Sequence, residues 1–320
     1  MITILGPTAS GKTVLAARLA FELNGEIISA DSRQVYREMN IGTGKDYDDY
    51  IVNGTLVPYH LIDIVDPGYE YNIFEFQKDF LSVYKDLKAR GKTPVLCGGS
   101  GMYLEAVLKG YHLSEARTDE DFLASLEGKT DDELAGLLRT FTLPHNTTDF
   151  YDRPRLFKAI LVARSSAIGG KDSLLSKDSG SRNTGFVFPC IDSTIFGINF
   201  PRGLVKTRIS ERLHDRLEHG MTDEVQALLD AGISPTRLMK YGLEYKFVTL
   251  YLTRQLSRSD LFSQLNIAIR QFAKRQMTWF RRMERHGIKI HWIDGRLPLD
   301  EKIDAIKAIL KTSGLQHRDD

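Results

Sequence analysis

The sequence predicts an α/β fold, in which a P-loop parallel sheet is flanked by helices and carries a helical insertion domain. Four short apolar runs rich in β-branched or aromatic residues predict the strands, at residues 2–5, 26–30, 94–97 and 196–200. The first three runs each lead into turn residues and then a helical pattern, which is typical of a doubly wound parallel sheet. The first of these turns reads Gly-x4-Gly-Lys-Thr, the pattern of a phosphate-binding loop.

The bulk composition is that of an ordinary globular protein of 320 residues, long enough for two lobes. With 42% hydrophobic residues, 27% charged residues and a net charge of +1, no global charge favours a polyanionic partner. Cys97 and Cys190 lie far apart with no C-x-x-C pair, which argues against a disulfide framework or a cysteine zinc module. This cysteine usage favours a reducing cytoplasm. We also expect no membrane segment, since no run approaches ~18 apolar residues.

The glycine loop follows the first predicted strand. Gly6 and Gly11 allow a tight turn whose N–H groups point inward, and the helix that follows adds the positive end of its dipole. Lys12 would neutralise phosphate oxygens, and the Thr13 hydroxyl would help to hold a phosphate-bound Mg²⁺. The motif predicts polyphosphate binding but does not select among kinases, ATPases and transferases.

Two further loops follow the second and third predicted strands, as DSRQVY from residue 31 and GGSGMY from residue 98. Because ligands bind beyond the carboxyl ends of parallel strands, we expect both loops to lie beside the glycine loop. A carboxylate at Asp31 would either coordinate Mg²⁺ or accept a proton from a nucleophile. A simple helix-capping role is the structural alternative.

The pattern changes between the third and fourth predicted strands. Helical periodicity and then a Ser/Gly-rich tract at 165–185 predict the insertion domain over 113–191, with a core domain formed by 1–112 and 192–315. After residue 200 the remainder is predicted to be helical, with a long helix over 258–286.

Several blocks of the chain resemble the signatures of the tRNA dimethylallyltransferase family, also called tRNA isopentenyltransferases. They are GPTASGKT, ADSRQVYREMNIGTGK, YHLIDIVDP, GGSGMYLEAVL, DFYDRPRLFKAILVAR, FGINFPRGLVKTRISERLHDRL and QFAKRQMTWFRR. Their order and spacing match the family over most of residues 2–294. No C-terminal Cys/His zinc module is present, so the chain resembles the compact bacterial type.

The resemblance implies transfer of a dimethylallyl group from dimethylallyl diphosphate to N6 of the adenosine 3′ of the tRNA anticodon. Asp31 would accept the N6 proton, and Mg²⁺ near Thr13 would help Lys12 to stabilise the departing diphosphate. The implied diphosphate site comprises Gly6, Pro7, Thr8, Ala9, Ser10, Gly11, Lys12 and Thr13. The implied contacts to tRNA are made by Asp31, Ser32, Arg33, Gln34 and Ser100, with Arg155 and Lys158 of the insertion on the anticodon stem-loop.

The long C-terminal helix independently predicts a phosphate-backbone track. Arg270, Lys274 and Arg281 recur on one helix face with Arg275 alongside, on a chain that is otherwise near neutral. A solvated charged face is the alternative.

One segment departs from the family pattern. The family commonly has an arginine or glutamine three residues before a Gly-Tyr pair, where this chain has Met239 before Gly242. We expect Arg237 to supply the missing diphosphate contact, with Lys240 as the other candidate.

Two other function classes remain open from the residues alone. One is an isopentenyltransferase acting on free adenine nucleotides, or a P-loop kinase; the other is a nucleotide switch that senses NTP. The basic residues at 155, 158 and 270–285 favour tRNA over both. We further expect a monomer.

Overall fold

The computed structural model describes residues 1–111, 113, 120–141, 153, 156, 157, 159–161, 163, 164 and 188–312. The chain forms two compact units, one of Met1–Gly110 with Cys190–Asp320 and the other of Tyr111–Pro189. Among the described residues, no helix is both long enough and apolar enough to cross a bilayer.

The larger unit is built on a six-stranded sheet in which every neighbouring pair of strands is parallel. The strand order is β5-β2-β6-β1-β7-β8. The strands are β1 (Ile2–Leu5), β2 (Gly25–Ser29), β5 (Tyr59–His60), β6 (Thr93–Gly98), β7 (Thr194–Asn199) and β8 (Ile290–Asp294). The predicted parallel sheet is therefore confirmed.

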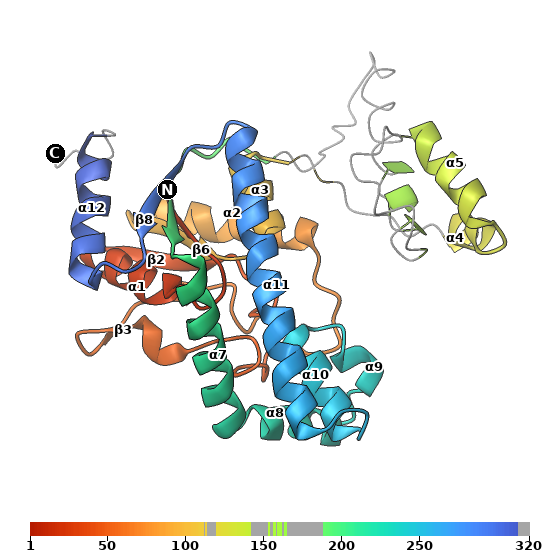
Figure 1. Cartoon of the computed structure of the whole chain (residues 1–320). Helices are drawn as coiled ribbons and strands as arrows, with labels where there is room; N and C mark the ends of the chain where they lie inside the picture. The colour runs from red at the N-terminus through yellow and green to blue at the C-terminus, as the bar shows by residue number, and fades with distance from the viewer. Residues whose placement is uncertain are drawn as a thin grey trace, which may run out of the picture. The chain divides into compact units, whose positions relative to one another are not determined.

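Helices cover both faces of this sheet (Figure 1). On one face α1 (Lys12–Glu22) packs against α12 (Leu299–Thr312), and both contribute to a buried cluster with Ile4 and Ile27. Side chains alternate along a strand, so Ile28 and neighbouring residues face the other side. There α2 (Ile73–Ala89) packs against β2, β6 and α3 (Gly101–Leu108).

A helical group follows β7 and has a core of its own. Residues of this group pack around Tyr245, Leu265 and Leu213, which are at most 2% exposed. The helices are α7 (Arg202–Glu218), α8 (Met221–Asp230), α9 (Pro235–Leu238), α10 (Leu243–Leu252) and α11 (Arg258–Arg285). The same cluster includes Val35 and Met39 from the segment after β2, which joins this group to the carboxyl edge of the sheet.

The smaller unit contains α4 (Glu120–Glu127) and α5 (Asp131–Phe141). Leu126, Leu134 and Leu138 from these helices pack with Leu156 and Ile160. The helical character predicted for this part is observed for the described residues, whereas the tract at 165–185 lies outside them. The role of this unit in binding tRNA stays a prediction.

The prediction that the chain is wholly helical after residue 200 is wrong at β8. Ile290–Asp294 pairs in parallel with β7 and extends the sheet by one strand. The segment is short and follows a long helix directly, so its strand character depends on a partner that is distant in the sequence. Between β2 and β5 the chain forms a short 3-10 helix, η1 (Tyr47–Tyr50), and a small antiparallel hairpin of β3 (Ile51–Val52) and β4 (Thr55–Leu56).

Candidate active site

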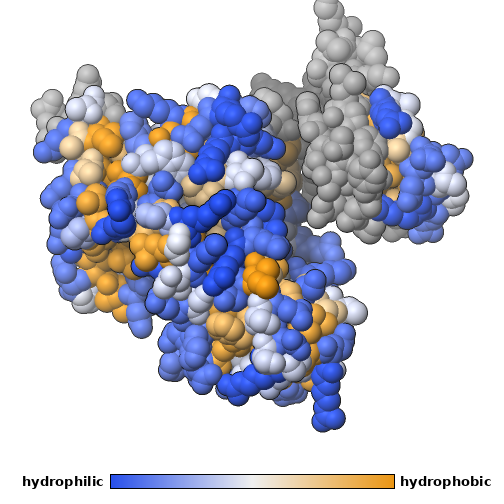
Figure 2. Space-filling model, viewed as in Figure 1, coloured by the Kyte–Doolittle hydropathy of each residue, from blue (hydrophilic) through white to orange (hydrophobic). Residues whose placement is uncertain are grey.

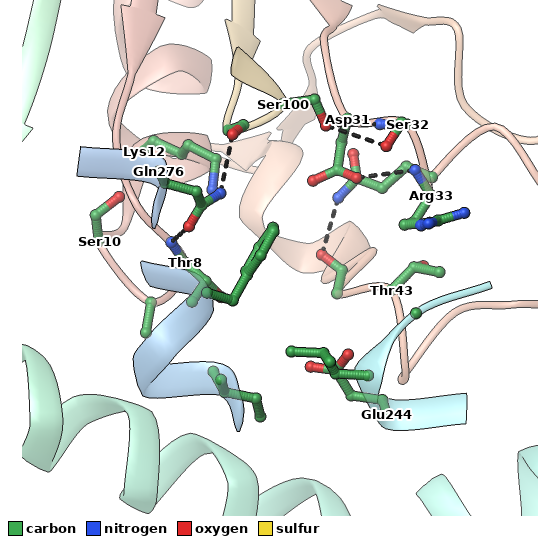
Figure 3. A pocket seen from close by; sticks show the side chains of 18 of the residues that line it. Thr8, Ser10, Lys12, Asp31, Ser32, Arg33, Thr43, Ser100, Glu244 and Gln276 are labelled. Atoms are coloured by element: carbon green, nitrogen blue, oxygen red, sulfur yellow. Dashed lines mark hydrogen bonds between the residues drawn. The ribbon is translucent and has the colours of Figure 1, made fainter. Parts of the chain in front are cut away.

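A cavity of about 1000 Å³ opens beyond the carboxyl ends of the strands in the larger unit. The glycine loop, the loop after β2 and the loop after β6 all line it, as the strand order predicts. Figure 3 shows Thr8, Ser10 and Lys12 on one side of this space and Asp31, Ser32 and Arg33 on the other. Three loops that are distant in the sequence therefore form one site.

The glycine loop has the geometry of an anion cradle. Gly11 adopts φ +74° at the N-cap of α1, in the left-handed region that glycine populates without strain. Lys12 and Thr13, the first residues of this eleven-residue helix, line the cavity, so the N-terminus of the helix with the positive end of its dipole lies at the cavity. Ser10 Oγ is buried without a hydrogen-bond partner among the described residues. Such a group is costly to bury unless a ligand satisfies it.

Lys12 lies in the same cavity, and its environment favours an anionic ligand. Burial lowers the pKa of its ammonium, while the negative charge of Asp31 opposes that shift. A bound diphosphate would add negative charge and restore the preference for the ammonium form.

The six predicted diphosphate residues from Thr8 to Thr13 line the cavity. Gly6 and Pro7 do not, and Gly6 instead lies against Ser10, whose Oγ would be 2.7 Å from a Cβ at that position. Gly6 thus supports the turn from behind.

Asp31 follows β2 and faces the cavity opposite Lys12. Its Oδ1 accepts a hydrogen bond from the Arg33 amide at 3.0 Å, which fixes the orientation of the carboxylate. Oδ2 has no hydrogen-bonded partner among the described residues. No helix begins at Asp31, so the helix-capping alternative is wrong, and the contact with Arg33 belongs to a turn. The carboxylate retains an oxygen that can accept a proton.

The loops after β2 and β6 are tied together by serine. Ser100 Oγ accepts the Ser32 amide at 3.0 Å, and Ser32 and Ser100 line the cavity with Arg33 and Gln34. Close packing also requires glycine at 101, where a Cβ would lie 2.5 Å from the Trp279 ring. Trp279 packs against this loop and also lines the cavity.

Gln276 on α11 is a site residue that we did not single out from the sequence. Its Oε1 accepts the Thr8 amide at 2.9 Å, and its Nε2 donates to the Gly99 carbonyl at 2.9 Å. The side chain thus clamps the glycine loop to the loop after β6 (Figure 3). Its place in the block QFAKRQMTWFRR was the only sequence signal for it.

Three arginines of α7 were also missed. Arg208, Arg212 and Arg216 recur every four residues and line the cavity. Arg208 Nε donates to the Ala9 carbonyl at 2.8 Å, so it braces the glycine loop. Arg212 and Arg216 bind the carboxylate of Asp46 at 2.7 and 3.0 Å. Burial acts to raise the pKa of Asp46, but these two arginines hold it below its ordinary value.

The segment around Met239 differs from expectation. Arg237 does not line the cavity, because its guanidinium donates to the Gly68 carbonyl. Met239 and Lys240 do line it. The geometry therefore favours Lys240, the second candidate, and the prediction at Arg237 finds no support.

Glu244 adds a further carboxyl group to a cavity that is lined by both acidic and basic side chains. Burial raises the pKa of this group, although Arg216 and Arg212 act in the opposite direction. No signal in the sequence had marked it as a site residue.

The predicted basic track on α11 is only partly directed at the cavity. Arg275 lines the cavity, whereas Arg270 donates to Ser210 Oγ at 2.7 Å on α7. Lys274 and Arg281 are exposed on the helix surface and do not line the cavity. The surface over α7 and α11 is largely hydrophilic in Figure 2. Arg155 and Lys158 lie outside the described residues.

The fold and this site define a class: a P-loop enzyme in which an acid faces the phosphate-binding loop across one cavity. The chain belongs to the IPP transferase family, whose profile matches residues 34–283. The isopentenyl transferase profile also matches residues 1–59.

Individual relatives agree with this assignment. The chain is 52% identical to tRNA dimethylallyltransferase 2 of Phocaeicola vulgatus, over 98% of each chain. It is 53% identical to tRNA dimethylallyltransferase 1 of Parabacteroides distasonis, over 97% of each chain. The crystal structure of a tRNA delta(2)-isopentenylpyrophosphate transferase from Staphylococcus epidermidis superposes with a TM-score of 0.67 at 29% identity, over 98% of each chain.

Proposed function

We propose that this protein transfers a dimethylallyl group from dimethylallyl diphosphate to N6 of the adenosine 3′ of the tRNA anticodon, releasing diphosphate. The observation that carries the proposal is the position of Asp31 opposite the glycine loop in one cavity. A phosphate cradle alone fits many P-loop enzymes, whereas this cavity also has room and an acid for a second substrate.

In this reaction the allylic C–O bond breaks and a C–N6 bond forms, so negative charge grows on the departing diphosphate. The amides of the glycine loop and Lys12 lie where they stabilise that charge. Asp31 accepts the proton that N6 loses, through the oxygen that Arg33 leaves free. Adenine N6 is a weak nucleophile, so orientation of the base matters as much as proton removal.

Mg²⁺ fits this site as a partner of the diphosphate rather than of a protein cage. No group of three or more His, Cys, Asp or Glu side chains in the described part of the chain is placed to hold a metal. Mg²⁺ is commonly held by substrate phosphates, water and one or two protein oxygens, and the Thr13 hydroxyl lies in the cavity to supply one. The ion would supply charge neutralisation of the diphosphate when bound.

The acceptor adenosine must leave the anticodon-loop stack to enter the cavity. Extruding a base is least costly in a single-stranded loop. Ser32, Arg33, Gln34 and Ser100 line the acceptor side, and Arg275 offers a cation at the same cavity. We assign the insertion unit, including Arg155 and Lys158, to the anticodon stem.

The free cysteines Cys97 and Cys190 support a cytoplasmic location, and a monomer remains our prediction.

A transfer assay tests the proposal. The protein is incubated with Mg²⁺ and labelled dimethylallyl diphosphate, with tRNA, AMP or ATP offered as acceptor. We expect label on tRNA that carries an adenosine 3′ of the anticodon, and none on tRNA with guanosine there. Label on AMP but not on tRNA would contradict the proposal and support the isopentenyltransferase acting on free nucleotides.

A further inference from the structure

Glu224 on α8 holds the backbone of a loop that is remote from it in sequence. Its Oε2 accepts hydrogen bonds from the amides of Asn40 at 2.8 Å and Ile41 at 2.7 Å. Its Oε1 accepts the Gly42 amide at 3.1 Å. One carboxylate therefore satisfies three successive backbone donors, an arrangement that suits its negative charge and both oxygens.

Tyr245 on α10 completes this contact. Its hydroxyl donates to Glu224 Oε1 at 2.6 Å, and its ring packs against Gly42, where a Cβ would lie 2.7 Å from the ring. The side chain is 1% exposed, so the hydrogen bond is shielded from water. Glu224 and Tyr245 thus fix residues 40–42 against the helical group.

The loop held in this way continues into the cavity. Thr43 and Gly44 line it, and the Gly44 carbonyl accepts a hydrogen bond from Gln34 Nε2 at 3.1 Å. Gln34 Oε1 in turn accepts from Ser29 Oγ at 2.9 Å. Gln34 lies only three residues from Asp31, so the position of Gly44 bears on the acceptor side of the cavity.

A second anchor of the same loop comes from Lys45. Its side chain is fully buried, and its Nζ donates to Asp63 Oδ1 at 2.5 Å and to the Tyr36 carbonyl. This anchor lies on the sheet side of the loop, whereas Glu224 lies on the helical group. Without Glu224 the loop would keep its attachment to the sheet and lose its attachment to α8.

We propose that Glu224, together with Tyr245, is a positioning residue for the acceptor adenosine, acting through the loop 40–44 on Gln34 and Asp31. The inference rests on the proposed function and names residues outside the cavity that this function needs. Neither residue lines the cavity, and neither contacts the glycine loop through any hydrogen bond in the described part of the chain. Their effect should therefore fall on the acceptor and spare the diphosphate.

The test is the substitution Glu224→Gln, which keeps the size of the side chain but removes its charge and one acceptor oxygen. The matched control is Asp223→Asn, an exposed acid next to it on α8 with the same change of charge. Inorganic pyrophosphate affinity, the thermal midpoint, and kcat and KM for tRNA are measured for wild type and both variants. We expect kcat/KM for tRNA to fall about tenfold or more in Glu224→Gln, with pyrophosphate affinity within about twofold of wild type.

Tyr245→Phe keeps the packing and removes one hydrogen bond, so it tests the same idea without risk to the core. We expect a loss of a few-fold in kcat/KM for tRNA and no change in pyrophosphate affinity. Equal losses on donor and acceptor, or Glu224→Gln behaving like Asp223→Asn, would overturn the inference. An inactive wild-type protein would instead count against the proposed function, so the two failures are distinguishable.

Discussion

The glycine loop and the loop after β2 face each other across one cavity but take their shapes from different sources. The glycine loop is eight consecutive residues whose turn depends on Gly11 and on the helix that starts at Lys12. The loop after β2 is shaped by side chains from elsewhere, among them Glu224, Tyr245 and Ser100. The turn on the donor side is thus specified locally, with added support from the distant Gln276 and Arg208, whereas the acceptor side is assembled by the tertiary fold.

We therefore expect substitutions in the two halves of the site to impair different steps. Changes in the glycine loop should weaken diphosphate binding, and changes around the loop after β2 should weaken use of the acceptor. Gln276 is the exception, because its side-chain amide bonds both to the glycine loop at Thr8 and to the loop after β6 at Gly99.

The largest expected effect is at Asp31. Asp31→Asn keeps the shape of the side chain but cannot accept the N6 proton, so we expect kcat to fall by about 10²–10⁴. Affinity for tRNA, measured by filter binding, should stay within a few-fold of wild type. The control is Asp48→Asn, an exposed acid on η1. Loss of binding in proportion to activity would indicate a structural role for Asp31.

We expect Lys12→Ala to weaken binding of the diphosphate and to leave binding of tRNA unchanged. Removing a cation that contacts phosphate costs about 1.5–3 kcal/mol, so we expect affinity for pyrophosphate to fall about 10- to 100-fold in a calorimetric titration. Lys85→Ala on the exposed face of α2 serves as the control. A drop in tRNA affinity with unchanged pyrophosphate affinity would contradict the division of the site.

Lys240 and Arg237 form a natural matched pair three residues apart. Lys240 lines the cavity, whereas Arg237 is bound to the Gly68 carbonyl. We expect Lys240→Ala to weaken pyrophosphate binding about three- to tenfold and Arg237→Ala to leave it unchanged, in the same titration. The reverse result would restore the cation predicted from the sequence.

The smallest effect on catalysis is expected at Glu26, a buried carboxylate at the other end of β2. Hydrogen bonds from Arg90 lower its pKa to about 2, with a further contribution from His60 and against the effect of burial. Because the folded-state pKa lies below the ordinary value of 4.5, the stabilisation is present above pH 4.5 and is lost as the pH falls toward 2. Discounted for the partial exposure of Arg90, it is about 2 kcal/mol.

Glu26→Gln should therefore lower the free energy of unfolding at pH 7 and flatten its decline in acid, measured by urea unfolding between pH 7 and the lowest pH at which the protein refolds. Activity on tRNA at pH 7 should remain that of wild type. A change in KM for tRNA would show that the two ends of β2 are coupled, and would weaken the contrast with Glu224.

The sequence by itself determined the parallel sheet, the glycine loop and Asp31, because each depends on residues close together in the chain. Apolar runs followed by turns specify strands, and the spacing of Gly6, Gly11, Lys12 and Thr13 specifies a phosphate loop. The resemblance of several ordered blocks to one family predicted the two substrates, the prenyl donor and the tRNA acceptor. The comparisons confirm the family, and the donor and acceptor of this chain stay proposals.

Only the tertiary structure decided which other side chains reach the cavity. Arg208, Arg212, Arg216 and Gln276 were marked only by lying in family-like blocks, which did not show that their side chains reach the site. Glu224 carries no local signal of its role. Arg237 and Lys240 could not be separated by sequence, because a few residues of helical turn point neighbouring side chains in different directions. The strand β8 could be assigned only from its parallel pairing with β7. Contacts between residues far apart in the chain depend on the packed fold, and the local pattern does not contain them.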